Sequence, residues 1–203
     1  MKVSAEAVRS IVTKSLEDAA ILGPTKPKIQ SAKFVEGIGK RLAEAFCDLS
    51  DKRSFQTVNK EGTGKIKGEW LLDVAIWQPF DEKDEGYPNS PAQFLKKLRW
   101  AVESETNTSL VEMASDFNKL LAVHSDHYLY LNGMTQKTDA ARSEYRERRL
   151  ATARRVLKKT SRQKQLTHFY YGFWPSPEWI RGHSLWEQDV ATLTAMVRVA
   201  RLA

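Results

Sequence analysis

The sequence predicts a mixed α/β domain in which a central mixed β-sheet is flanked by helices. Apolar residues recur at helical spacing near the start of the chain, as at Val8, Ile11 and Leu16. Further on, short runs rich in apolar, β-branched and aromatic residues alternate with helical patterns, beginning with EWLLDVAIW at 69–77. With 203 residues, the chain is long enough for one domain with a substantial core, so we expect residues 1–203 to form a single domain.

The chain opens with two predicted helices. The first covers residues 4–21, and a loop with two prolines follows at 23–28. The second covers residues 33–49, where apolar residues form one stripe. A weakly alternating run at 53–60 predicts a strand, and Glu61-Gly-Thr-Gly after it is typical of a turn.

Two strands and a helix form the middle of the predicted sheet. The strands cover 69–77 and 95–105, and residues 79–93 between them carry three prolines and several charges, which indicates a loop. A helix over 108–123 follows. Ser109 opens it, with a glutamate three residues later at capping-box spacing.

The last part of the chain continues the alternation. We expect a short strand at 126–132, a long basic helix at 138–161, an aromatic strand at 166–174 and a final helix at about 185–201. The core of the domain would then span about 33–174.

Positive charge is concentrated in one segment. The formal net charge is +7, and residues 137–164 hold eleven Lys or Arg against three Asp or Glu. Such a distribution favours a polyanionic partner, most often nucleic acid, although a solvated helix face explains it equally well. The candidate phosphate-binding residues are Arg148, Arg149, Arg154, Arg155, Lys158 and Lys159, with Lys65 and Lys67 near the predicted turn.

Cysteine content and hydropathy bear on the compartment. The single cysteine, Cys47, leaves no internal disulfide and suits a reducing cytosol. Residues 1–20 carry charges throughout and do not resemble a signal peptide, and no run of about 18 apolar residues is present. The expectation is therefore a cytoplasmic protein that does not span a membrane.

Acidic residues interrupt the two central strands. Glu103 and Glu105 share one face of their strand, because side chains alternate along it, and Asp73 interrupts the apolar strand before it. If the two strands are neighbours, Asp73 and Glu103 converge, and their mutual repulsion calls for a cation. Oxygen ligands of this kind suit Mg²⁺, Mn²⁺ or Ca²⁺ and not zinc.

This arrangement resembles the PD-(D/E)xK nuclease superfamily over about residues 33–132. In that restriction-endonuclease-like fold, an Asp on one strand and a (D/E)-x-K on the next bind a divalent metal beside the scissile phosphate. The resemblance makes Asp73 the motif Asp and Glu103 the second acid. Glu105 stands where the family usually has Lys, as in those type II restriction enzymes whose motif ends E-x-E.

The resemblance also suggests two further catalytic residues. The first helix of the family's core often supplies another acid, for which Glu36 fits best and Glu44 is the alternative. Lysines migrate onto the helix after the motif in this family, so Lys119 is a candidate for the missing motif lysine. Solvated surface positions remain an alternative explanation for both glutamates.

The implied function is hydrolysis of DNA phosphodiester bonds by an endonuclease that depends on Mg²⁺, with Mn²⁺ as a substitute. A role in restriction or phage defence and a homodimeric state are further implications of the resemblance. Glu105 would accept a proton from the attacking water or bind a second ion. Two alternatives stay open: a non-catalytic DNA-binding or interaction protein on the same fold, and a nuclease acting on RNA or branched DNA.

Overall fold

The computed structural model describes residues 3–21, 27–46, 56–59, 71–82, 92–160, 168–175 and 195–198. Helices and strands account for most of this part of the chain. In chain order they are α1 (Ala5–Ile21), α2 (Pro27–Phe46), β1 (Gln56–Asn59), β2 (Val74–Glu82), β3 (Ala92–Glu105), α3 (Leu110–Ala122), β4 (His127–Met134), α4 (Asp139–Lys159), β5 (Phe169–Pro175) and β6 (Ala195–Arg198). None of these helices is both long enough and apolar enough to cross a membrane.

The described strands form one sheet, and their order across it follows the chain from β1 to β6. β1, β2 and β3 are antiparallel neighbours, whereas β3, β4 and β5 run parallel to one another. β6 returns antiparallel to β5. The sheet is therefore mixed, as the sequence predicts. Its parallel neighbours require crossover connections, and α3 and α4 supply them.

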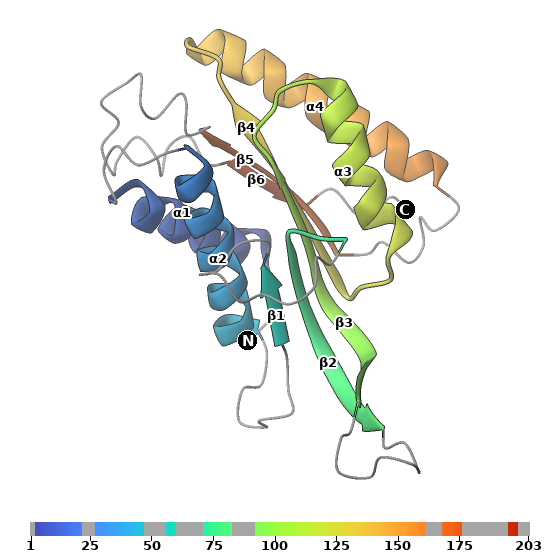
Figure 1. Ribbon diagram of the computed structural model, residues 1–203. Helices are drawn as coiled ribbons and strands as arrows, with labels where there is room; N and C mark the ends of the chain where they lie inside the picture. The colour runs from blue at the N-terminus through green and yellow to red at the C-terminus, as the bar shows by residue number, and fades with distance from the viewer. Residues whose placement is uncertain are drawn as a thin grey trace.

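The helices cover both faces of the sheet (Figure 1). α1 and α2 pack together on one face, and α3 and α4 lie over the other. The second pair shares a face because two successive crossovers of the same hand, advancing in the same direction, stay on one side. The result is a three-layer α/β/α arrangement with the helices outside.

Two apolar clusters hold these layers together. One joins α1 and α2 to the sheet and includes Val74, Ile76 and Trp100. The other lies between the sheet and the α3–α4 pair and includes Ala75 and Ala101. Alternate residues of β2 thus enter opposite clusters, as strand geometry requires. Every residue of β5 is buried, which is typical of a strand covered on both faces.

The boundaries of three elements differ from the predictions. α2 starts at Pro27 and not at residue 33, because a proline fits the first turn of a helix, where its missing N–H leaves no hydrogen bond unmade. β2 and β3 extend into the predicted loop at 79–93, pairing from Pro79↔Leu95 to Glu82↔Ala92. A proline in a strand is tolerated at such irregularities, and the pairing register shifts between Gln78 and Pro79.

The predicted C-terminal helix at about 185–201 is wrong at residues 195–198. This segment is β6, which pairs with β5 from Tyr170↔Arg198 to Phe173↔Ala195. Without β6, the outer edge of β5 would present unpaired backbone groups, and strand pairing satisfies them. The remainder of that predicted helix lies outside the described residues.

Candidate metal centre

Strand pairing brings Asp73 and Glu103 together. Val74 pairs with Val102 in the antiparallel β2–β3 register, so Asp73, just before β2, stands opposite Glu103. The backbone N–H of Asp73 donates to Glu103 Oε1 at 3.2 Å, and the N–H of Ser104 donates to Asp73 Oδ2 at 2.9 Å. Each carboxyl group is thus held by the backbone of the neighbouring segment. Asp73 precedes β2 and does not interrupt it, contrary to the prediction.

Glu103 is almost completely buried, with 1 % of its surface exposed. Burial raises the pKa of its carboxyl to about 8, the charges of Asp73 and Asp116 add to the rise, and Lys119 opposes it. Near neutral pH this group is therefore mostly protonated while no cation is present. A buried acid with a strongly shifted pKa beside other charged groups is a frequent mark of a functional site.

Lys119 reaches the same place from α3. Its Nζ lies 2.6 Å from Asp116 Oδ1 and 3.4 Å from Glu103 Oε2. Burial lowers the pKa of Lys119, but the hydrogen bond with Asp116 and the charge of Glu103 outweigh burial and raise it overall. The ammonium group therefore stays charged and acts as a fixed positive charge, not as a general base.

Glu105 lies at the end of β3. Its Oε1 accepts a hydrogen bond from the backbone N–H of Asn107 at 2.6 Å. Burial raises the pKa of the Glu105 carboxyl, the Asn107 N–H opposes the rise, and a side-chain hydrogen bond with Asp116 adds to it. Glu105 and Glu103 therefore both interact with the same aspartate of α3.

The analysis of the sequence missed Asp116. This residue is 9 % exposed and sits among Met113, Phe117 and Leu120, the buried residues of α3. A carboxylate on the apolar stripe of an amphipathic helix was the available signal, because such a position buries charge without an evident partner. Asp73, Glu103, Glu105 and Asp116 are named the acid cluster below.

The donor atoms of the acid cluster suit a hard cation, but they do not form a complete metal cage. Among the described residues, no group of three or more His, Cys, Asp or Glu side chains is arranged to hold a metal ion. Mg²⁺ needs fewer protein ligands, since it is often bound through one or two carboxylates together with water and substrate phosphate. Asp73 and Glu103 meet that smaller requirement.

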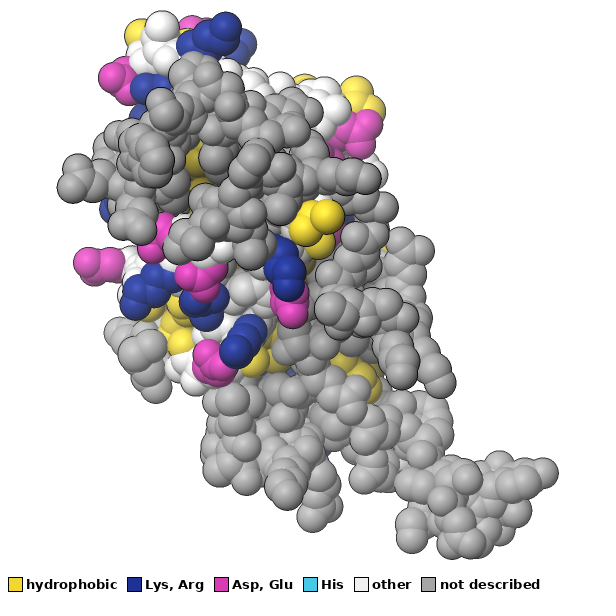
Figure 2. Space-filling view, turned by 60° about the vertical axis from the view of Figure 1, so that its left-hand side comes forward, with side chains coloured by type: hydrophobic (Ala, Val, Ile, Leu, Met, Phe, Trp, Pro, Cys, Tyr) yellow, Lys and Arg dark blue, Asp and Glu magenta, His cyan; other side chains and the backbone are white. Residues whose placement is uncertain are grey.

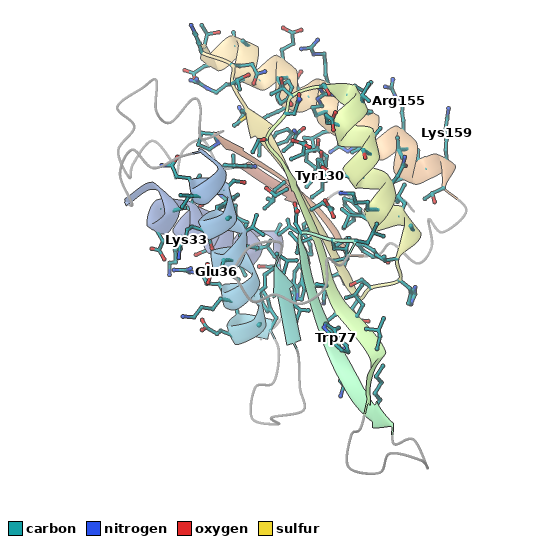
Figure 3. The ribbon with its side chains drawn as sticks, viewed as in Figure 1. Lys33, Glu36, Trp77, Tyr130, Arg155 and Lys159 are labelled. Carbon is teal, nitrogen blue, oxygen red and sulfur yellow. The ribbon has the colours of Figure 1, made fainter. Side chains whose placement is uncertain are left out.

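The structure places Glu36 away from the acid cluster. Its carboxylate lies 3.8 Å from Lys33 Nζ on α2, and both residues are on the α1–α2 side of the molecule, opposite Tyr130 (Figure 3). Glu36 and the alternative Glu44 line a groove of about 390 Å³. The groove is also lined by Asp18, Ala19, Lys33, Gly37, Lys40 and Arg41. Basic and acidic side chains stand side by side on this face (Figure 2).

The predicted basic residues of α4 fall into two groups. Arg148, Arg154, Arg155, Lys158 and Lys159 are exposed. Arg155 and Lys159 project away from the sheet (Figure 3). Arg149 instead donates a hydrogen bond to the Thr108 carbonyl and lies 5.1 Å from the centre of the Tyr145 ring, so it fastens α4 to the start of α3. The predicted contacts Lys65 and Lys67 lie outside the described residues.

Comparisons of this chain with protein-family models, with curated proteins and with solved structures found no match. The family resemblance therefore depends on the motif residues and the order of the elements alone.

Proposed function

We propose that the chain is an endonuclease of the PD-(D/E)xK type that hydrolyses DNA phosphodiester bonds with Mg²⁺, for which Mn²⁺ can substitute. The observation that carries the proposal is the meeting of Asp73, Glu103 and Lys119 where β2, β3 and α3 adjoin. The order of elements adds support, because α2, the antiparallel β1–β2–β3 meander, α3 and the parallel strand β4 follow the sequence of that family's core.

Asp73 and Glu103 would hold the cation. When bound, the cation supplies charge stabilisation at the phosphoryl oxygens and makes water a better nucleophile. The backbone N–H groups of Asp73 and Ser104 keep the two carboxyl groups in place at 3.2 and 2.9 Å, so little reorganisation is needed on binding.

Lys119 and Glu105 divide the work that the family's motif lysine does alone. The ammonium of Lys119 is anchored by Asp116 at 2.6 Å and can donate to a phosphate oxygen as negative charge develops there. The carboxylate of Glu105, two residues beyond Glu103, can accept a proton from the attacking water. The departure from the usual motif thus leaves both a positive charge and a base in the site.

The exposed basic residues of α4 would contact DNA phosphates. Arg154, Arg155, Lys158 and Lys159 cluster in the last two turns of the helix, where they add positive potential without reading sequence. Arg149 takes no part in this surface because its guanidinium group is engaged by Thr108 and Tyr145.

The test is cleavage of supercoiled plasmid by the full chain in Mg²⁺ or Mn²⁺, with EDTA as the blank. Wild type should nick or linearise the plasmid, and Asp73→Asn and Glu103→Gln should each lose at least about 100-fold in rate. Glu17→Gln, a carboxylate-to-amide change on α1, is the matched control and should cut like wild type. Single-stranded DNA, RNA and branched DNA are tested in parallel. Failure to cut any of them, with DNA binding retained, would favour the non-catalytic binding protein.

A further inference from the structure

The side chains of Glu105 and Asp116 are joined by a hydrogen bond between the end of β3 and the buried face of α3. Ionised carboxylates only accept hydrogen bonds, so two of them can be joined in this way only while they share a proton. That proton occupies a position between oxygen atoms of two nearby carboxyl groups. A hard divalent cation prefers the same kind of position.

A second observation also points to a ligand here. Tyr130 is fully buried, and its hydroxyl has no hydrogen-bond partner among the described residues. A buried hydroxyl without a partner is rare in native proteins and calls for a missing ligand, ion or water. Tyr130 stands directly beside Glu103 in the parallel β3–β4 register and lies between the sheet and α3 (Figure 3).

The Tyr130 hydroxyl points towards the Glu105–Asp116 pair. Contacts with Phe117 at 5.5 Å and Tyr171 at 5.2 Å between ring centroids fix its ring. Burial and Tyr171 raise the pKa of the hydroxyl, and the charges of Asp116 and Glu105 add to that rise, as expected for a hydroxyl in their field. Its oxygen can accept a hydrogen bond from water in the shell of a cation.

The next inward residue of β4 supports the same site. Asn132 is fully buried and stands beside Glu105 in the register. Its Oδ1 accepts hydrogen bonds from Tyr171 at 2.9 Å and from Tyr145 at 3.3 Å, which fixes the orientation of the amide. Its Nδ2 is buried and has no partner among the described residues, so it is a donor suited to a carboxylate oxygen.

We infer that Glu105 and Asp116 form a second divalent-cation site, with the Tyr130 hydroxyl ordering a water ligand of that ion. This inference deepens the proposed function and rests on it, because it adds a second ion next to the one assigned to Asp73 and Glu103. Asp116 then has two roles: one oxygen anchors Lys119 at 2.6 Å, and the carboxyl group also binds the ion together with Glu105.

The experiment measures Mn²⁺ binding to the full chain without DNA, by calorimetry for stoichiometry and by electron paramagnetic resonance for coupling between ions. Wild type should bind two equivalents and give a spin-coupled spectrum. Asp116→Asn and Asp73→Asn should each bind one equivalent and give the spectrum of an isolated ion. Tyr130→Phe, which changes no charge and almost no volume, should weaken the second equivalent about 10-fold.

The outcomes separate the two proposals. One equivalent in wild type, lost in Asp73→Asn and kept in Asp116→Asn, would overturn the second site and leave the proposed nuclease centre intact. Two equivalents that persist in Asp116→Asn would overturn it as well. Unchanged Mn²⁺ affinity in Tyr130→Phe would reject the role of that hydroxyl. An absence of Mn²⁺ binding in wild type, together with no cleavage, would remove the proposed function and the second site with it.

Discussion

Replacing Glu103 by Gln should stabilise the protein in the absence of metal, and the gain should grow with pH. The pKa of the Glu103 carboxyl is raised from 4.5 to about 8 in the folded state, mainly by burial. The folded state therefore binds a proton more tightly than the unfolded state. This group's contribution to stability is complete below about pH 4.5 and is lost as the pH rises towards 8. Glutamine has no proton to lose, so it avoids that loss.

The magnitude follows from the two pKa values. The full penalty is about 5 kcal/mol, since one pKa unit corresponds to about 1.4 kcal/mol. Proton linkage makes it about 1 kcal/mol at pH 5 and about 4 kcal/mol at pH 8. Glutamine forfeits the charged contact with Lys119, for which about 2 kcal/mol is reasonable. The net gain is then about 2 kcal/mol at pH 8, or about 4–8 °C in Tm for a chain of this length.

The assay is urea denaturation, together with thermal melting, of wild type and Glu103→Gln in EDTA at several pH values between 5 and 8. The difference in unfolding free energy should rise with pH, from near or below zero at the acid end to clearly positive at the alkaline end. Glu17→Gln should show no such trend, since it makes the same chemical change on α1. A constant difference between wild type and Glu103→Gln, or a less stable variant at pH 8, would refute the burial argument for Glu103.

Three further outcomes are expected. Calorimetric titration of Mn²⁺ at pH 7 in buffers of different ionisation enthalpy should show release of about 0.9 proton from Glu103, falling to about 0.1 at pH 9, and a buffer-independent enthalpy would contradict this. Alanine at the four exposed positions of α4 should weaken binding to a labelled duplex and flatten its salt dependence by about 0.9 per lost phosphate contact. These positions are Arg154, Arg155, Lys158 and Lys159. Arg149→Ala should instead lower Tm by loss of its contacts with Thr108 and Tyr145, with an unaltered salt slope. Lys119→Met should reduce plasmid cleavage at least about 100-fold, and adding Glu105→Lys should restore part of the rate by returning an ammonium to the usual motif position. No recovery in that double variant would show that a carboxylate is needed at residue 105.

Local patterns in the sequence were sufficient for much of the sheet. Alternation in β2 and β3 separates Val74 and Ile76 from Ala75, and the structure sends these residues into opposite clusters. The pairing of Asp73 with Glu103 followed from the same pattern, because strands close in the chain are often antiparallel neighbours and a two-residue repeat fixes their faces. The N-cap was equally local: Ser109 accepts from the Glu112 N–H at 3.1 Å.

The sequence by itself determined the alternation of helices and strands and the placement of two acids on one strand pair, since both depend on residues a few positions apart. Only the tertiary structure decided that α3 lies over Glu103, with Asp116 and Lys119 turned towards it, that Arg149 joins α4 to Thr108, that Glu36 lies elsewhere and that residues 195–198 pair with β5. These features depend on how elements far apart in the chain pack against each other. A buried carboxylate on a helix has the same local pattern whatever it faces, and its chemistry is set by the groups that packing brings within a few ångströms.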